Sequence, residues 1–403
     1  MDQTLRSIFR TVWYWKIGDA MKKTNAKLYL TFPLQRFPAG FFGMNCNNMS
    51  RWCWLLILLI MVGTDRQSHA QALNIPFKEA GISFGNSQVF NGLRLNFRDR
   101  QVEKINGLNI TFWGAKENEK AQVNGVSLGL LPEAGYLRGV QLGILGVGAE
   151  QEIRGVSLGL LGAGSGDRVC GLAAGGLGIG AGKSMTGIFL GGLGAGSGGT
   201  INGIVIGGLG AGAGGDCKGL AIGGLGVGSG GNFTGISLAG MGAGASGNIK
   251  GITLALLGAG AGEDITGITV GGLGAGCGGD LKGVVLGGLG AGCGGELKGV
   301  ALAGFGAGAP TVRGLILSVL FAGGNEIHGI TLAGLNLRVN DNGSYSGLSA
   351  SAFNYIKGRQ TGLAVGIINY SWHLNGVQLG ILNYVRDNPK YLKILPVINA
   401  HFD

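Results

Sequence analysis

The sequence predicts an all-β protein, and more specifically a single-domain β-solenoid with about sixteen residues per coil. One sixteen-residue unit, of the type GIVIGGLGAGAGGDCK, recurs ten times between Gly155 and Leu302 without an insertion. A fixed period over many copies indicates a repeat architecture. The spacing of the apolar residues excludes the 3-and-4 pattern of a helix. The 87 glycines among 403 residues also set the chain apart from ordinary globular domains.

Each repeat is described below by columns 1 to 16, counted from its opening glycine, such as Gly203. Large apolar residues recur in columns 2, 4, 7 and 15, and small apolar residues recur in column 9. Alternation holds within columns 2 and 4, changes at the glycines of columns 5 and 6, and holds again in columns 7 and 9. This pattern predicts two short strands per coil, with coils stacked so that their apolar columns form one core.

An antiparallel outer-membrane β-barrel with one strand per repeat is the alternative fold. Twelve apolar or glycine residues between polar turns could cross a bilayer as a tilted strand. A barrel strand should alternate lipid-facing apolar with lumen-facing polar residues, whereas these repeats hold few polar residues between turns. The sequence favours the solenoid. The alternating C-terminal strand that ends at Phe402 keeps the barrel, and a pore or transport function, open as the second interpretation.

The chain divides into three parts. Residues 1–48 show no repeat and are predicted to be unstructured or to be an over-long start of the reading frame. Residues 49–72 have the basic, apolar and small-residue regions of a secretory signal peptide, with cleavage expected after Ala70 or Ala72. Residues 73–403 form the Gly-rich repeat domain, which is regular over 155–302 and has irregular capping repeats at both ends.

The high net charge belongs mainly to the segment that export would remove. Residues 1–71 hold nine Lys and Arg and three Asp and Glu, so only +4 of the formal +10 remains on the rest of the chain. A weak net charge gives no support to nucleic-acid binding. We therefore expect no nucleic-acid partner.

Units at the two ends of the domain resemble a known family. GVQLGIL begins at Gly139, GLAVGIINY at Gly362 and GVQLGILNYV at Gly376. These units resemble the Gly-Val-Gln-Leu-Gly-Leu-Ile-Asn repeats of bacterial surface-repeat proteins, which follow a signal peptide. The resemblance implies an exported protein of the cell surface or outer membrane, here of a Gram-negative bacterium. It assigns no functional residues.

No residue is predicted to have a catalytic, cofactor-binding or metal-binding role. The GKS motif that ends at Ser184 lacks the first glycine of a phosphate-binding loop, because Leu177 stands there. His328, His373 and His401 belong to separate repeats. We therefore expect a non-enzymatic protein with a structural, adhesive or interaction role, with no cofactor and no small-molecule substrate.

Two cysteines form a candidate disulfide. Cys277 and Cys293 occupy column 11 of adjacent repeats, which places them one coil apart in a solenoid. That separation is within disulfide reach, and an exported chain meets oxidising conditions. The alternative is that column 11 requires only a small residue, as Ser197 and Ala213 indicate.

Column 3 supplies the predicted interaction face. It lies between apolar columns 2 and 4 and is expected to point outward, where Phe189, Val205 and Val285 would form a long, weakly apolar surface. Such a surface usually marks an interface. Its expected partner is a surface or envelope component, another copy of the chain, or the membrane.

Overall fold

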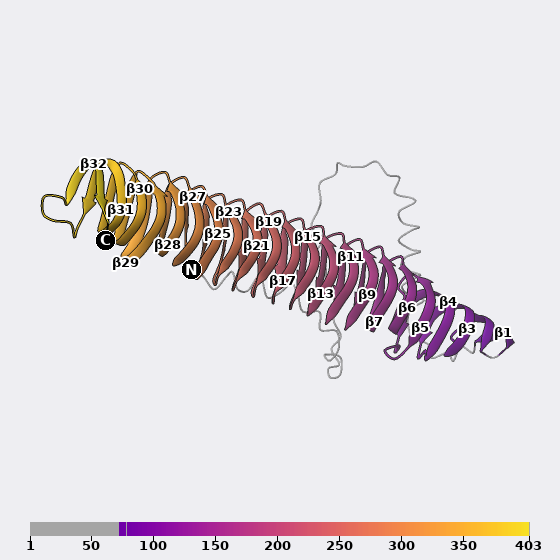
Figure 1. The fold of residues 1–403 in the computed structure, drawn as a ribbon. Helices are drawn as coiled ribbons and strands as arrows, with labels where there is room; N and C mark the ends of the chain where they lie inside the picture. The colour runs from indigo at the N-terminus through magenta and orange to yellow at the C-terminus, as the bar shows by residue number, and fades with distance from the viewer. Residues whose placement is uncertain (1–71, 78, 403) are drawn as a thin grey trace, which may run out of the picture. The chain divides into compact units, whose positions relative to one another are not determined.

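The computed structural model describes residues 72–77 and 79–402. The predicted N-terminal extension and nearly all of the predicted signal peptide lie outside the described residues. The described part is all-β, and its strands wind into a solenoid of about 18 turns with about 16 residues per turn (Figure 1). The fold class predicted from the sixteen-residue period is confirmed. No helix in this part of the chain is suited to cross a membrane.

Each regular coil contains one long strand and one short strand. In one coil these are β13 (Thr200–Gly207) and β14 (Gly210–Ala213), with a sharp turn at Gly208 and Leu209 between them. Each strand pairs in parallel with the strand one coil further on, so that Gly203 lies opposite Gly219. The barrel interpretation is therefore wrong, because consecutive repeats stack as parallel coils rather than as antiparallel hairpins.

The strands have the following bounds. The N-terminal coils contain β1 (Leu73–Phe77), β2 (Ala80–Phe84), β3 (Val89–Arg100), β4 (Lys104–Lys116), β5 (Gln122–Gly129), β6 (Glu133–Gly143) and β7 (Gly146–Gly159). The other long strands of the regular coils are β9 (Arg168–Gly175), β11 (Ser184–Gly191), β15 (Cys217–Gly223), β17 (Phe233–Ala239), β19 (Ile249–Ala255), β21 (Ile265–Gly271), β23 (Leu281–Gly287) and β25 (Glu296–Ala303). The other short strands are β8 (Gly162–Ser165), β10 (Gly178–Ala181), β12 (Gly194–Ser197), β16 (Gly226–Ser229), β18 (Gly242–Ala245), β20 (Gly258–Ala261), β22 (Gly274–Cys277), β24 (Gly290–Cys293) and β26 (Gly306–Gly308). The C-terminal coils contain β27 (Thr311–Ser318), β28 (Phe321–Ala333), β29 (Asn336–Ala350), β30 (Phe353–Val365), β31 (Ile368–Val385) and β32 (Ile394–His401).

Both ends of the solenoid are closed by an antiparallel strand. β1 pairs antiparallel with β2, and β32 pairs antiparallel with β31. The interior also becomes polar near the N-terminal end, where the fully buried Arg94 contacts Asp99 at 2.5 Å and Asn109 at 2.8 Å. A buried charge requires such partners. The end coils therefore differ from the regular coils in their interior as well as in their length.

The interior of the regular coils is narrow and wedge-shaped. Columns 3, 5, 9, 11 and 15 point inward: columns 5, 9 and 11 hold small residues such as Ala211 and Ala213, whereas column 15, at the wide end, holds large ones such as Phe233. Near the sharp turn the two strands come closest: a Cβ added to Gly207 would lie 1.9 Å from the carbonyl oxygen of Gly210 across the interior. No large side chain fits there, so the leucines and isoleucines of the neighbouring columns must point outward.

Candidate functional site

The predicted interaction face is wrong in its direction. Phe189, Val205 and Val285 each have 0% of their surface exposed and belong to the core. The residues on either side of column 3 are the exposed ones, since side chains alternate along a strand. Ile188 and Leu190, which flank Phe189, are both 42% exposed. Column 3, predicted to form the surface, is thus interior, and columns 2, 4 and 7, predicted to form the core, are on the surface, whereas columns 9 and 15 are buried as predicted.

The outward apolar side chains form one continuous surface, which we call the apolar face. Between residues 140 and 335 of the described chain, 29 large apolar side chains are at least 36% exposed, and all but Phe321 stand in columns 2, 4, 6 or 7. The highest exposures occur beside the sharp turn, in column 6. They reach 61% at Ile144, 68% at Leu160 and 72% at Leu256. Monomeric soluble proteins rarely expose a contiguous apolar patch of this extent.

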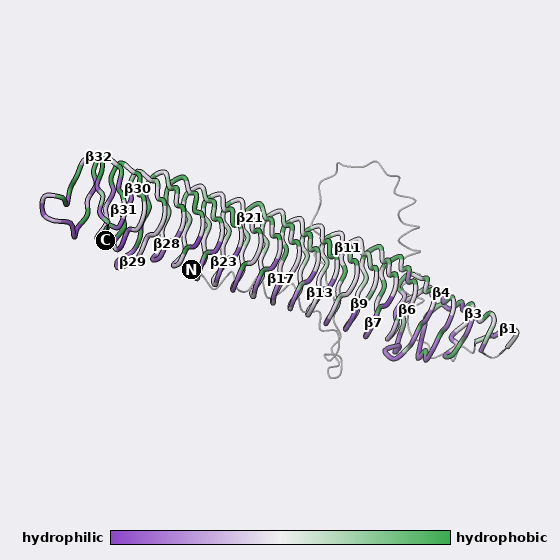
Figure 2. Tube along the Cα trace, in the orientation of Figure 1, coloured by the Kyte–Doolittle hydropathy of each residue, from purple (hydrophilic) through white to green (hydrophobic). Residues whose placement is uncertain are grey.

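The charged side chains gather along a different edge. Every Asp, Glu, Lys and Arg between residues 155 and 302 stands in columns 13 to 16, and six are acidic and six are basic. We call these columns the charged edge. Figure 2 shows hydrophobic residues along one long edge of the solenoid and hydrophilic residues along the opposite edge. The regular coils are therefore amphipathic across the solenoid axis.

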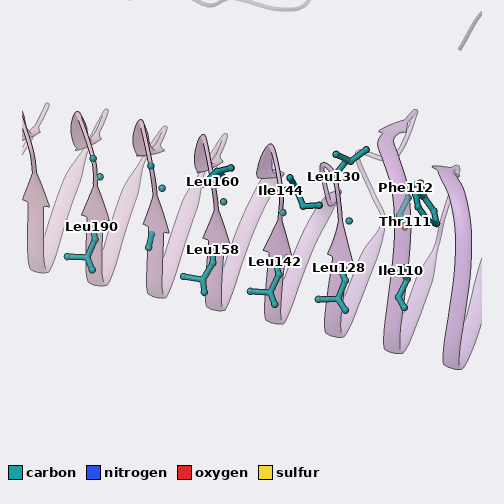
Figure 3. Close-up of a pocket in the computed structure, with 18 of the residues that line it drawn as sticks. Ile110, Thr111, Phe112, Leu128, Leu130, Leu142, Ile144, Leu158, Leu160 and Leu190 are labelled. Atoms are coloured by element: carbon teal, nitrogen blue, oxygen red, sulfur yellow. The ribbon is translucent and has the colours of Figure 1, made fainter. Parts of the chain in front are cut away.

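Shallow grooves run along the apolar face. One groove of about 1020 Å³ lies on the N-terminal half and is lined by columns 4, 5 and 6 of successive coils. Figure 3 shows Leu128, Leu142, Leu158 and Leu190 of column 4 projecting in one direction from their coils. A second groove of about 860 Å³ uses the same columns on the C-terminal half. Its lining includes the column 4 residues Leu286, Leu302, Leu317 and Leu332. The groove floor is formed by glycine in most coils, which leaves room between the two apolar rows.

Hydrogen bonds between coils hold the charged edge in register. The Asp216 Oδ1 atom accepts from the Asn232 backbone N–H at 2.8 Å, and the Asn232 Oδ1 atom accepts from the Asn248 backbone N–H at 2.9 Å. The same contact continues in column 14 through Asp264, Asp280 and Glu296. The column 14 side chains therefore form hydrogen bonds between neighbouring coils rather than within one turn.

Cys277 and Cys293 lie opposite each other on β22 and β24, as their shared column predicted. Both are free thiols in this structure. A hydrogen bond between the two sulfurs raises the pKa of Cys277 and lowers the pKa of Cys293. The separately buried Cys217 has its pKa raised to about 11 by burial. The stacking of the two coils thus places the two thiols side by side.

The histidines considered for catalysis lie on different strands, β28, β31 and β32. The His373 Nδ1 atom is 2.7 Å from Asp387 Oδ2. A hydrogen bond from Arg386, followed by the charge of His373, holds the pKa of Asp387 below its usual value. The Arg386 guanidinium also lies 4.0 Å from the ring centre of Trp372. These contacts form a structural cluster at the C-terminal end of the solenoid.

Residues 72–77 and 79–402 contain no group of three or more His, Cys, Asp or Glu side chains that could hold a metal ion. Comparison of the chain with family models, curated proteins and solved structures found no match. The apolar face with its grooves is therefore the feature of the described residues that indicates a function.

The apolar face was missed because large apolar residues were assigned to the core by their hydrophobicity alone. Residue size indicates the opposite orientation. In most repeats column 3 holds a smaller residue, such as Ala221, Ser237 or Thr253, than columns 2 and 4, which hold mainly isoleucine and leucine. Small residues suit a narrow interior, and the larger ones must then lie outside.

Proposed function

We propose that this chain is an exported, non-enzymatic repeat protein of the bacterial cell surface or outer membrane, with a structural or adhesive role. In this proposal a stiff solenoid presents its apolar face to a partner, and the charged edge remains in water. The single observation that carries the proposal is the apolar face itself, because an exposed apolar surface of this length is costly unless something covers it.

Two features of the sequence support the location. Residues 49–72 have the pattern of a secretory signal peptide, and the end units resemble those of bacterial surface-repeat proteins. A pore or transport function depended on a closed barrel, and stacked parallel coils provide no lumen of that kind. We therefore propose the structural or adhesive role alone.

Fractionation of a Gram-negative host that expresses the full chain tests the location. We expect the exported protein to begin at Gln71 or Leu73, by N-terminal sequencing, and to be cut when protease is added to intact cells. A matched chain without residues 1–72 should stay inside the cell and resist the protease. A full chain that keeps its N-terminus and remains protected in intact cells would contradict the proposal.

Adsorption to a phenyl-coated surface tests whether the apolar face is the contact surface. The triple variant Leu193→Asn, Leu209→Asn, Leu225→Asn removes three column 7 side chains that are each 50% exposed. We expect at least a tenfold weaker retention, because each lost side chain removes apolar contact area. The control variant Lys218→Gln, Lys250→Gln, Lys282→Gln on the charged edge should be retained like the wild type. Equal retention of all three proteins would exclude the apolar face as the contact surface.

A further inference from the structure

We infer that the partner of the apolar face is a second copy of this chain, with the column 4 ridge of each copy seated in the groove of the other. This inference rests on the proposed function and names the partner of the same surface. It follows from the shape of the groove, from the area available and from the chemistry of the lining.

The surface has a ridge and a groove side by side. The column 4 side chains Leu142, Leu158 and Leu190 are 39–42% exposed and form the ridge. The groove lies between this ridge and the column 6 residues Ile144 and Leu160 (Figure 3), over a floor of column 5 glycines. Both features run along the solenoid axis, the ridge with a gap at Ala174 and the column 6 wall as far as Leu160, because Gly176 and Gly192 follow it in that column. A straight ridge beside a straight groove is the shape that a self-complementary contact requires.

A two-fold axis parallel to the solenoid axis, running between the two apolar faces, would bring the two features together. It places the ridge of one copy on the groove of its partner, and the groove of the first on the ridge of the second. The side chains of both ridges recur once per coil, at the strand separation of about 4.8 Å. Two copies with the same repeat therefore match along the whole contact, which an unrelated protein surface would do only by chance.

The area is sufficient for a stable dimer. The 29 exposed side chains, Phe321 among them, offer about 1500 Å² of apolar surface, at about 50 Å² for each half-exposed side chain. A standard interface buries about 800 Å² on each partner. Contact along slightly more than half of the face reaches this area, and homodimer interfaces are the more apolar class.

An extended peptide is a poorer occupant of the groove. The backbone groups beneath it are already paired between coils: the Gly176 N–H donates to the Gly159 carbonyl at 3.2 Å, and the Gly192 N–H donates to the Gly175 carbonyl at 2.9 Å. A bound strand gains affinity mainly from main-chain hydrogen bonds to an open sheet edge. The groove offers paired backbone and apolar side chains, so a peptide would leave its own polar groups unsatisfied.

A lipid bilayer is also less well matched. Surfaces that lie in a membrane interface combine apolar residues with Trp or Tyr anchors and with excess Lys and Arg. On this face the exposed aromatic side chains are few: Phe305 and Phe321 among the 29, and Phe112 and Trp113 in the earlier coil that begins at Gly107. The charged edge between residues 155 and 302 holds six acidic and six basic residues, which gives no net attraction to anionic lipid. A second copy requires neither feature.

Sedimentation equilibrium of the exported protein, which begins at Gln71 or Leu73, tests the inference. We expect the wild type to be a dimer and the ridge variant Leu142→Asn, Leu158→Asn, Leu190→Asn to dissociate with a Kd at least about 100-fold higher. The control variant Lys218→Gln, Lys250→Gln, Lys282→Gln should remain a dimer. Circular dichroism of each variant shows whether it is folded. A photo-crosslinking benzoylphenylalanine at Leu158 of the otherwise wild-type chain should capture a second copy, and the same probe at Lys218 should not.

Two results would overturn the inference, and they separate it from the proposed function. A wild type that stays monomeric at about 100 µM excludes the second copy; if it is still retained by the phenyl surface, the proposed contact surface survives. A monomer that floats with phosphatidylethanolamine vesicles identifies a bilayer as the occupant instead. A dimer that the ridge variant leaves intact, with no crosslink from position 158, places the interface elsewhere.

Discussion

At the scale of single residues, the solenoid depends on one glycine per coil. The column 1 glycines from Gly81 to Gly376 all have φ between +106° and +149°, a region that residues with a side chain rarely adopt. A Cβ at Gly235 would also lie 2.0 Å from the carbonyl oxygen of Gly219 in the preceding coil. Two independent constraints, backbone angle and close stacking, therefore require glycine in column 1.

Replacing Gly235 by alanine should destabilise the protein by about 3 kcal/mol, because the change combines backbone strain with a steric clash. Chemical denaturation followed by circular dichroism measures the effect. Gly242→Ala is the matched control in the same coil. Its added Cβ would lie 3.8 Å from the nearest atom, the Gly258 carbonyl oxygen, so its stability should be unchanged or higher by up to about 1 kcal/mol. Equal losses in the two variants would show that column 1 has no special role.

At the scale of the strands, the sequence was sufficient to predict the coil, but not to predict which side chains face its interior. The period, the two strands per repeat and the stacking of Cys277 on Cys293 were all predictable, because each follows from the sixteen-residue spacing. The direction of β11 and β13 was not, because apolar residues occupy both faces of the strand and alternation alone permits two solutions. The close approach of Gly207 to the opposite strand decides between them, and that distance depends on how the coil folds.

Column 14 links neighbouring coils through side chains that accept hydrogen bonds from backbone N–H groups. The Asp216 carboxylate is held charged chiefly by the Asn232 backbone N–H, so its pKa is lowered from the ordinary 3.8. Because the folded-state pKa is depressed, this contact contributes stability above about pH 4 and loses it as the pH falls through the lowered pKa. The contact is exposed to solvent, so its contribution is small.

Asp216→Asn should therefore change how stability depends on acid. Asparagine keeps an oxygen that can accept the Asn232 N–H, as Asn232 itself does for Asn248, but it does not titrate. We expect the denaturation midpoint of the wild type to fall more than that of the variant between pH 6 and pH 2. Paired urea titrations at the two pH values measure the difference, and the pH 6 pair serves as the reference. Parallel losses in the two proteins would mean that Asp216 carries no acid-sensitive contact.

At the scale of the described solenoid, the narrow interior and the apolar face have one cause. Near the sharp turn the thin coils have room only for small residues inside, and the larger apolar residues that flank them are left on the surface. The same thin coils repeat in register, so every local feature becomes a line parallel to the axis. This is why a side chain such as Leu209 becomes part of a row that runs along the apolar face.

Because each coil contacts mainly its two neighbours, removing one whole coil should leave the fold intact. Deletion of residues 219–234 joins Lys218 to Gly235 and restores the column order, so that Gly203 would stack on Gly235. We expect a folded chain whose longest dimension by small-angle scattering is shorter by about 4.8 Å. Its melting temperature should fall by only a few degrees, because the interface between regular coils is re-formed.

Deletion of residues 219–226 is the control. Removing half a coil places Val227 where column 1 requires glycine, and this chain should lose its cooperative melting. If the two deletions melt alike, the coils do not stack as independent units along the axis.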